Sequence, residues 1–286
     1  MDKEFPIDNI AKHILPNYTA GFLPGFPKEI SCRGNIDILS SELLITIVGT
    51  RKPSDYGILL IEKLFEVLAK HHRRITTISG LAFGIDALTH ELSLKYHIPT
   101  IAIPGSGLHD DVIGPRTNLN IAHRILKNNG LLLSPFSEKD TSRPSMFPQR
   151  NLLMAAMSNV VIVIEALTKS GSLITAHEAL SYGKPVYVFP GSFFSPLSEG
   201  CHELIQKGAE VMVSFESFVE DMNLNNNQME LALLSGVPTN IWDLPHSLSE
   251  LCEHFKKSPP EMLSEITLLE LDGVIKNIGG RYQKVK

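Results

Sequence analysis

The chain has 286 residues, of which 43% are hydrophobic and 20% are charged. This composition is typical of a globular protein, and the length favours two domains over one. No apolar run approaches the roughly 20 residues that a bilayer-spanning helix needs, and the start of the chain lacks the charged and apolar regions of a signal peptide. We therefore expect a cytoplasmic protein with no membrane partner.

The cysteines and histidines give no sign of a disulfide framework, a metal site or a cofactor. Cys32, Cys201 and Cys252 lie far apart without CxxC spacing, and the 11 histidines form no HExxH or HxH pattern. The net charge of -5 and the pI near 6.1 weigh mildly against nucleic-acid binding over the whole surface. A groove that binds nucleic acid, however, needs only local basic residues.

The first 40 residues carry four prolines and several glycines with little periodicity, so we expect an irregular lead segment over a sheet edge. Between residues 41 and 216, strands alternate with glycine turns and helices. This order predicts an α/β fold with a Rossmann-like, doubly wound and mostly parallel sheet. The expected strands are 43–48, 74–79, 100–103, 131–134, 160–165 and 185–189, and the expected helices are 56–70, one starting near 85, 119–127, an apolar run before residue 160, and 176–181.

The rest of the predicted sheet is arranged around the stretch from Arg143 to Ala176. Residues 160–165 form an apolar, β-branched run that reads as a strand buried on both faces. A turn of small residues follows it and opens the next helix, where free backbone N–H groups favour an anion such as phosphate. The polar residues on the two flanks are Arg143, Gln149, Arg150 and Asn151 before the strand, and Lys169, Ser170, Gly171, Ser172 and Thr175 after it.

Glycine turns follow five of the expected strands. Because the carboxyl ends of parallel strands meet at one edge, these turns should rim a single crevice. Each turn alone is equally compatible with simple chain reversal. No GxGxxG opens the first helix and no GxxxxGK[ST] occurs, which disfavours a dinucleotide site and excludes a P-loop. The turns are Gly49-Thr50-Arg51, Ser79-Gly80, residues 104–107, Gly171-Ser172 and residues 190–192.

After Glu216 the composition changes. Residues 217–228 contain an Asn run typical of a solvated linker with a helical start, and residues 229–286 show three short helical patterns and a hairpin around 277–280. The pattern predicts a small C-terminal winged-helix domain, with a generic helical cap as the alternative. Glu261, Glu265 and Glu270 disfavour duplex reading by this domain and favour a protein-contact role.

The motifs GTRKPSDYG, SGLAFGIDALTHELSL, FPQRN, EALTKSGSLITAHEAL and PGSFFSPLSEGCHELIQKGA together resemble the DNA processing protein A (DprA/Smf) family. The resemblance covers about residues 20–215 closely and the C-terminal domain more loosely. It implies a non-enzymatic Rossmann-like domain that binds single-stranded DNA and forms homodimers. It also implies a role in escorting incoming strands during natural transformation, and in loading RecA onto strands covered by single-strand binding protein.

The chain departs from the family pattern in several ways. We expect the helical N-terminal domain of many members to be absent. Leu152 follows FPQRN where an arginine is usual, Phe83 replaces a common basic residue, and Cys201-His202 stands where many members have Thr-Asn. The changes at Leu152 and Phe83 remove positive charge near the expected site, which bears on affinity and not on the position of the site.

We predict a DNA-binding site whose arginines clamp phosphate and whose Phe147 offers a face for base stacking. Several of these residues also have a possible structural role that involves no DNA. Arg51 could pair with a helix, Arg150 and Asn151 could brace their loop, and Phe147 could anchor it. Ser172 and Thr175 fit helix capping. The predicted DNA-binding residues are Gly49, Thr50, Arg51, Gly80, Arg143, Ser145, Phe147, Gln149, Arg150, Asn151, Lys169, Ser170, Gly171 and Ser172.

Two other functions remain open on sequence grounds. Glu165 and Asp86 could serve a nucleotide-binding or nucleotide-cleaving SLOG-type protein, since the expected fold resembles the LOG phosphoribohydrolases. The PGGxGTxxE signature of those enzymes is missing, and Asp86 also suits a role in accepting backbone hydrogen bonds. Cys201-His202 is no catalytic dyad by adjacency alone. The remaining alternative is a scaffold that only recruits proteins.

Overall fold

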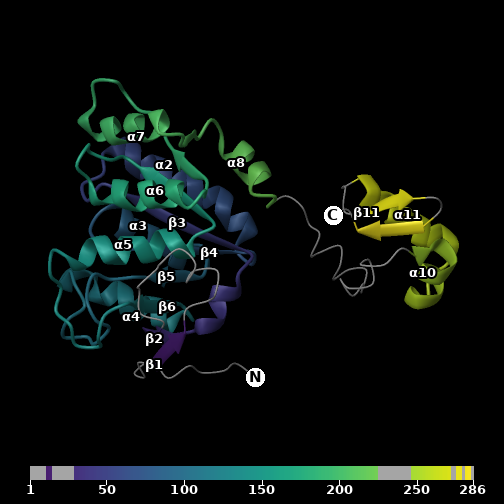
Figure 1. The fold of residues 1–286 in the computed structure, drawn as a ribbon, viewed down its shortest axis with the longest axis horizontal. Helices are drawn as coiled ribbons and strands as arrows, with labels where there is room; N and C mark the ends of the chain where they lie inside the picture. Colours follow the sequence, from purple (N-terminus) through teal and green to yellow (C-terminus); the bar gives the residue numbers. More distant parts are fainter. Residues whose placement is uncertain (1–10, 15–28, 225–245, 272–274, 279–280, 285–286) are drawn as a thin grey trace. The chain divides into compact units, whose positions relative to one another are not determined.

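The computed structural model describes residues 11–14, 29–224, 246–271, 275–278 and 281–284. The chain divides into two compact units, residues 1–218 and 219–286. Figure 1 shows the first unit as a sheet covered by helices, and the second as a small group of helices and strands.

The first unit alternates strands and helices as its sequence predicts. The strands are β1 (Ala11–Ile14), β2 (Glu29–Gly34), β3 (Leu43–Gly49), β4 (Ile75–Ser79), β5 (Thr100–Ala102), β6 (Leu131–Ser134), β7 (Val160–Ile164), β8 (Val186–Val188) and β9 (Glu210–Val211). The α-helices are α2 (Asp55–Leu68), α3 (Ile85–Lys95), α4 (Leu119–Lys127), α5 (Met146–Met157), α6 (Gly171–Ser181), α7 (Pro196–Gln206) and α8 (Phe215–Asp221), and the short 3-10 helices are η1 (Ile36–Ser40), η2 (Ala69–His71) and η3 (Arg116–Asn118).

The strands form one mostly parallel sheet in the order β1-β2-β6-β5-β4-β3-β7-β8-β9. The chain runs outward from β3 through β4 and β5 to β6, and then returns to place β7 on the other side of β3. In the β3–β7 pair, Val48 lies opposite Val163 and Gly49 opposite Ile164. The order of the strands reverses at this pair, so the crevice outside its carboxyl ends is where such sheets bind ligands.

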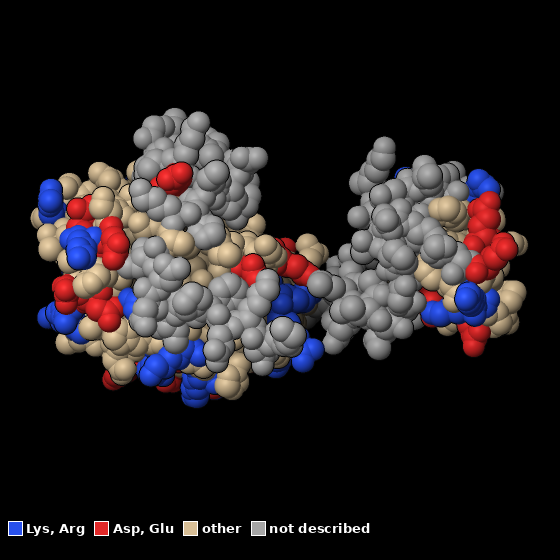
Figure 2. Space-filling view, turned by 90° about the horizontal axis from the view of Figure 1, so that it is seen from below, with Lys and Arg blue, Asp and Glu red and all other residues tan. Residues whose placement is uncertain are grey.

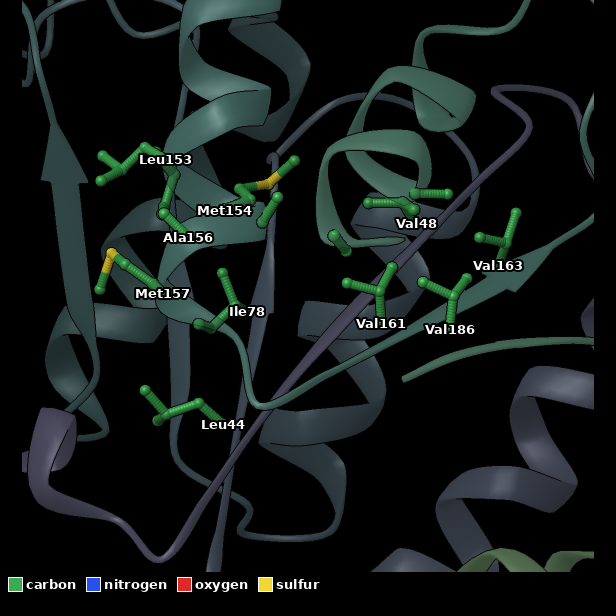
Figure 3. Packing of buried hydrophobic residues seen from close by; sticks show 14 of the residues in the cluster. Leu44, Val48, Ile78, Leu153, Met154, Ala156, Met157, Val161, Val163 and Val186 are labelled. Carbon is green, nitrogen blue, oxygen red and sulfur yellow. The ribbon is translucent and has the colours of Figure 1, made fainter. Parts of the chain in front are cut away.

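Helices cover both faces of the sheet because the central strands are apolar on both sides. Leu131 and Leu133 of β6 face one apolar cluster and Leu132 faces the other. Helices α5, α6 and α7 lie over the first face (Figure 1), and α2, α3 and α4 lie over the second. Figure 3 shows the side chains of α5 meeting β3, β4 and β7 in the first cluster. The prediction of a Rossmann-like, doubly wound sheet is confirmed.

The first 40 residues are more regular than predicted. Strand β2 pairs antiparallel with β6, with Cys32 opposite Leu133, and β1 pairs antiparallel with β2. Ile30 and Cys32 are buried in the first cluster. The prediction of an irregular segment was wrong here, because β2 gains its stability from pairing with an apolar strand about 100 residues away rather than from local periodicity.

The predicted linker at 217–228 begins inside α8. Phe218 is fully buried and packs edge-on against Tyr187, with 5.1 Å between the ring centroids. Residues 225–228 lie outside the described residues, as does the first of the three helical patterns expected in the C-terminal part, 229–236.

The described part of the second unit contains α10 (Leu248–Phe255), α11 (Pro259–Leu271), and a sheet of β10 (His246–Ser247), β12 (Arg281–Lys284) and β11 (Ile275–Ile278) in that order. Strands β11 and β12 pair antiparallel, as the expected hairpin requires. Leu251, Met262, Ile266, Ile275 and Tyr282 form its small core. A capping box at Ser247 and Glu250 fixes the start of α10.

Candidate nucleic-acid interface

A cavity of about 640 Å³ opens at the carboxyl ends of β3 and β7, at the point where the strand order reverses. It lies between the turn after β3, the first turns of α5 and α6, and the loop after β4. Its lining residues are Val48, Gly49, Thr50, Arg51, Lys52, Ala82, Asp86, Phe147, Arg150, Asn151, Met154, Leu167, Lys169, Ser170, Gly171, Ser172, Thr175 and Leu197.

Three glycines at this edge differ in what a Cβ atom at their position would contact. A Cβ on Gly49 would lie 2.0 Å from the carbonyl oxygen of Ile164, and one on Gly80 would lie 1.4 Å from an Arg150 nitrogen. Both positions are therefore fixed by packing inside the protein. A Cβ on Gly171 would meet only Asn151 Nδ2, at 3.9 Å, so that glycine borders open space in the cavity. Only Gly171 has the free space that a ligand approaching the backbone would use.

The first turn of α6 presents polar groups to the cavity. Ser170 is the N-cap, and its hydroxyl accepts from Ser172 N at 3.3 Å and lies 2.6 Å from Ser172 Oγ. Helix α6 begins at Gly171, five residues earlier than the sequence suggested, because Ser170 caps it there. Thr175 is fully buried, and its hydroxyl has no hydrogen-bond partner within the described part of the chain. This end of α6 combines the positive end of the helix dipole with three hydroxyl groups.

Helix α5 brings FPQRN to the same place, but it turns the polar side chains of that motif in two directions. Arg150 is 4% exposed and donates to the carbonyl of Ile103 at 3.0 Å. Asn151 is also buried and donates to the carbonyl of Gly171 at 3.0 Å, which ties α5 to α6. The bracing interpretation therefore holds for both residues, although both still line the cavity.

Asp86, from the first turn of α3, lies on the cavity floor beside Arg150. Its carboxylate is 3.8 Å from the Arg150 guanidinium and accepts from Ala82 N at 3.3 Å. Burial raises the pKa of Asp86, and the charge of Arg150 only partly offsets that effect. Asp86 thus holds its proton to higher pH than an ordinary aspartate.

Three cations at the rim carry most of the positive charge of the site. Arg51, Lys52 and Lys169 are exposed and line the cavity, and none is in an ion pair within the part of the chain that the structure describes. The guanidinium of Arg51 lies 5.9 Å from the centroid of the Phe147 ring. The Thr50 hydroxyl accepts from Lys52 N at 3.3 Å, which fixes the turn that carries both cations.

Four of the predicted residues lie outside the cavity lining, and one cation that lines the cavity was not among those predicted. Gly80 packs against the Arg150 guanidinium and does not line the cavity. Arg143, Ser145 and Gln149 are exposed around the start of α5, outside the lining. Lys52 was missed, although its place beside Arg51 in the same turn is a signal that the sequence contains.

The other candidate chemical groups have structural partners. Glu165 accepts from Ser54 N at 2.8 Å and from the Ser54 hydroxyl, so it braces the start of α2 against β7. Burial raises the pKa of the Cys201 thiol to about 11, and His202 lies 3.3 Å from the carbonyl of Gly191. Within the described residues, no group of three or more His, Cys, Asp or Glu side chains is placed to hold a metal ion.

The surface around the described part of the chain is mixed in charge. Figure 2 shows basic and acidic side chains side by side on the face in view, as the net charge of -5 leads one to expect. Among the residues that the structure describes, no helix is both long and apolar enough to cross a membrane.

Comparison with known proteins gives a consistent result. The chain matches the family described as DNA recombination-mediator protein A over residues 10–223. It is 36% identical to the DNA processing protein DprA of Bacillus subtilis over 202 residues, which cover 71% of this chain and 66% of that protein. It is 31% identical to the protein Smf of Escherichia coli over 295 residues, which cover 96% of this chain and 78% of that protein.

Two solved structures resemble the fold closely. DprA from Streptococcus pneumoniae superposes with a TM-score of 0.68 and 32% identity, covering 76% of this chain and 75% of that one. DprA from Helicobacter pylori, whose structure is described for its single-stranded DNA binding mode, superposes with a TM-score of 0.66 and 30% identity, covering 77% and 96%. On this fold and these matches, the chain belongs to the DNA recombination-mediator protein A family, the family of DprA and Smf.

Proposed function

We propose that this protein binds single-stranded DNA in the cavity at the carboxyl ends of β3 and β7 and acts as a recombination mediator. The observation that carries the proposal is the group of three rim cations, Arg51, Lys52 and Lys169, which have no acidic partner among the described residues. Cations without a partner in the protein are available to phosphates, and phosphate contacts dominate nucleic-acid affinity.

The shape of the site favours a single strand over a duplex. The cations surround a hollow instead of lying on a helix that could enter a groove, and the half-buried Phe147 ring lies among them. An aromatic face stacks a base for roughly 1–3 kcal/mol, and only unpaired bases can reach it. The relative from Helicobacter pylori, described for its single-stranded DNA binding mode, supports the same interpretation.

The remaining roles follow from the family. We propose that the protein assists RecA loading on strands coated with single-strand binding protein, protects incoming DNA in natural transformation, and works in the cytoplasm. We also propose that two copies pair through the Rossmann-like unit, because one acidic subunit offers only a short basic track. Light scattering that finds a strict monomer at micromolar concentration, with full DNA binding, would contradict the dimer.

We propose that the second unit is a winged-helix domain with a protein-contact role. Its two described helices and its three-stranded sheet suit that fold. On α11, Glu265 pairs with Lys257, and Glu261 accepts from Ser258 N at 3.0 Å. An acidic helix of this kind is poorly suited to entering a DNA groove.

We propose that the protein is not an enzyme. Glu165, the strongest candidate for acid–base chemistry at the sheet edge, is held by two hydrogen bonds from Ser54. Incubation with nucleoside monophosphates, followed by chromatography, tests the alternative directly. Release of free base at a rate that Glu165→Gln abolishes would establish the nucleotide-cleaving function in its place.

Fluorescence anisotropy with labelled oligo-dT, repeated with the same length of duplex, tests the proposed function. We expect the single strand to bind more tightly and the affinity to fall as salt rises. A protein that recruits partners without touching DNA would leave the anisotropy flat. Preference for the duplex would contradict the assignment of the site.

A further inference from the structure

The cavity floor contains two buried polar atoms that have no hydrogen-bond partner among the residues that the structure describes. Arg150 Nε and Thr175 Oγ1 lack hydrogen bonds, although Arg150 is 4% and Thr175 is 0% exposed. They come from different helices, α5 and α6, and both residues line the same cavity. Buried donors are normally satisfied, so two unsatisfied ones in one hollow indicate a ligand that reaches the floor.

The charges in the cavity select the kind of ligand. Arg51, Lys52, Arg150 and Lys169 line it, against Asp86 as the single acidic lining residue. Such an excess of cations favours a dianion over a monoanion. A phosphate monoester is mostly dianionic at neutral pH, since its second pKa is about 6, whereas the diester inside a strand carries one charge.

The depth of the two unpartnered atoms selects the end of a strand. An internal phosphodiester continues into sugar on both sides, so the strand must leave the site in two directions. Because Arg150 is 4% and Thr175 is 0% exposed, a phosphate that reaches them must move inward from the rim, and an internal phosphate would draw sugar inward on both sides. A terminal phosphate needs only one exit and can enter end-on. The open space at Gly171 places that group at the positive end of α6, beside Thr175.

We propose that the cavity floor seats the terminal phosphate of a single strand, bound by Arg150 and the Thr175 hydroxyl at the start of α6. This inference rests on the proposed function, and it adds a preference for strand ends to general binding along the rim. Internal phosphates contact Arg51, Lys52 and Lys169, and the terminal one goes deeper.

Four versions of one oligonucleotide test the inference: 5′-phosphorylated, 3′-phosphorylated, without terminal phosphate, and covalently circularised. We expect one of the two phosphorylated strands to bind at least about tenfold more tightly than the unphosphorylated strand, and the circle to bind no better than the latter. Comparison of the 5′ and 3′ forms identifies which end enters. Repeating the titration at pH 5 should shrink the advantage, because the monoester then becomes a monoanion.

Thr175→Val links the effect to the floor. The substitution keeps the shape and removes a hydroxyl that has no partner in the protein, so the fold should be retained. We expect it to reduce the advantage of the phosphorylated strand several-fold, because it should lower the affinity for the phosphorylated strand more than the affinity for the unphosphorylated strand. Equal binding of all four strands, or an advantage that Thr175→Val leaves intact, would overturn this inference alone. If none of the four strands binds, the proposed function falls together with it.

Discussion

Gly171→Ala separates contacts made to a ligand from contacts made inside the protein. The added methyl group would meet only Asn151 Nδ2, at 3.9 Å, which is ordinary van der Waals contact. Alanine is a better helix former than glycine by about 1 kcal/mol, and Gly171 is the first residue of α6. The variant should therefore be as stable as the wild type or slightly more stable.

Its DNA binding should fall, because the methyl group occupies the space through which a phosphate reaches the start of α6. Loss of one charge-assisted hydrogen bond costs about 1.5–3 kcal/mol, which corresponds to roughly 10- to 150-fold in the dissociation constant. Anisotropy with oligo-dT that is labelled at one end and phosphorylated at the other, used in both orientations, measures this change, and a thermal melt run in parallel checks the fold.

Gly114→Ala is the matched control. A Cβ at Gly114 meets nothing within 4 Å, and Gly114 lies outside the cavity lining, so both stability and binding should be unchanged. If Gly171→Ala binds as tightly as the wild type, no ligand approaches that backbone and the site is misplaced. If it melts well below the wild type, the added methyl group disturbs the folded protein, and the inference that Gly171 borders open space is wrong.

Further substitutions test individual contacts. Arg51→Ala should weaken DNA binding at least tenfold, because Arg51 lines the cavity. Arg143 is exposed and lies outside the lining, so Arg143→Ala should weaken binding by less than about fivefold. Equal losses of affinity for the two variants in anisotropy would contradict the cavity as the DNA-binding site. Asp86→Asn should strengthen binding by about 1 kcal/mol at neutral pH, since it removes the acidic group on the floor, and unchanged or weaker affinity in anisotropy would contradict this role of the carboxylate. Burial raises the pKa of Asp86, so the folded state keeps a proton that the unfolded state loses above about pH 3.9; urea unfolding should therefore show the stability of the Asn variant rising relative to the wild type as pH increases above that value, and a constant difference would contradict the raised pKa. Lys184→Met should lower the free energy of unfolding by about 1–3 kcal/mol without changing DNA affinity normalised to folded protein, because Lys184 Nζ donates to the carbonyls of Ala155, Ala156 and Ser158 at the end of α5.

The sequence was sufficient to predict the sheet and the edge at which the site lies. Apolar strands alternating with glycine turns predicted β3 to β8, and the small residues around Gly171 predicted the start of a helix facing an anion. Strands β1 and β2 could not be predicted in this way, because both are short, β2 depends on pairing with β6, and β1 depends on pairing with β2. Their stability is a property of the folded sheet and not of the local sequence.

The direction of each side chain in FPQRN was beyond sequence reasoning. Arg150 turns inward because Gly80, 70 residues earlier in the chain, leaves room for its guanidinium. Arg143, with the same chemistry, stays outside the cavity on the exposed approach to α5. Both arginines are equally plausible ligands in the sequence, and only the packing of a distant glycine distinguishes them.

The salt dependence of single-strand binding tests the central claim most directly. For single strands, the slope of log K against log salt concentration is about -0.7 for each phosphate neutralised, so the three rim cations alone predict a slope of roughly -2 for each subunit. The measurement compares the wild type with a variant in which Arg51, Lys52 and Lys169 are all replaced by alanine. We expect the triple variant to keep the wild-type melting temperature and to lose most of this slope together with most of the affinity for single-stranded DNA. A folded triple variant with the wild-type slope would show that DNA is bound elsewhere on the protein.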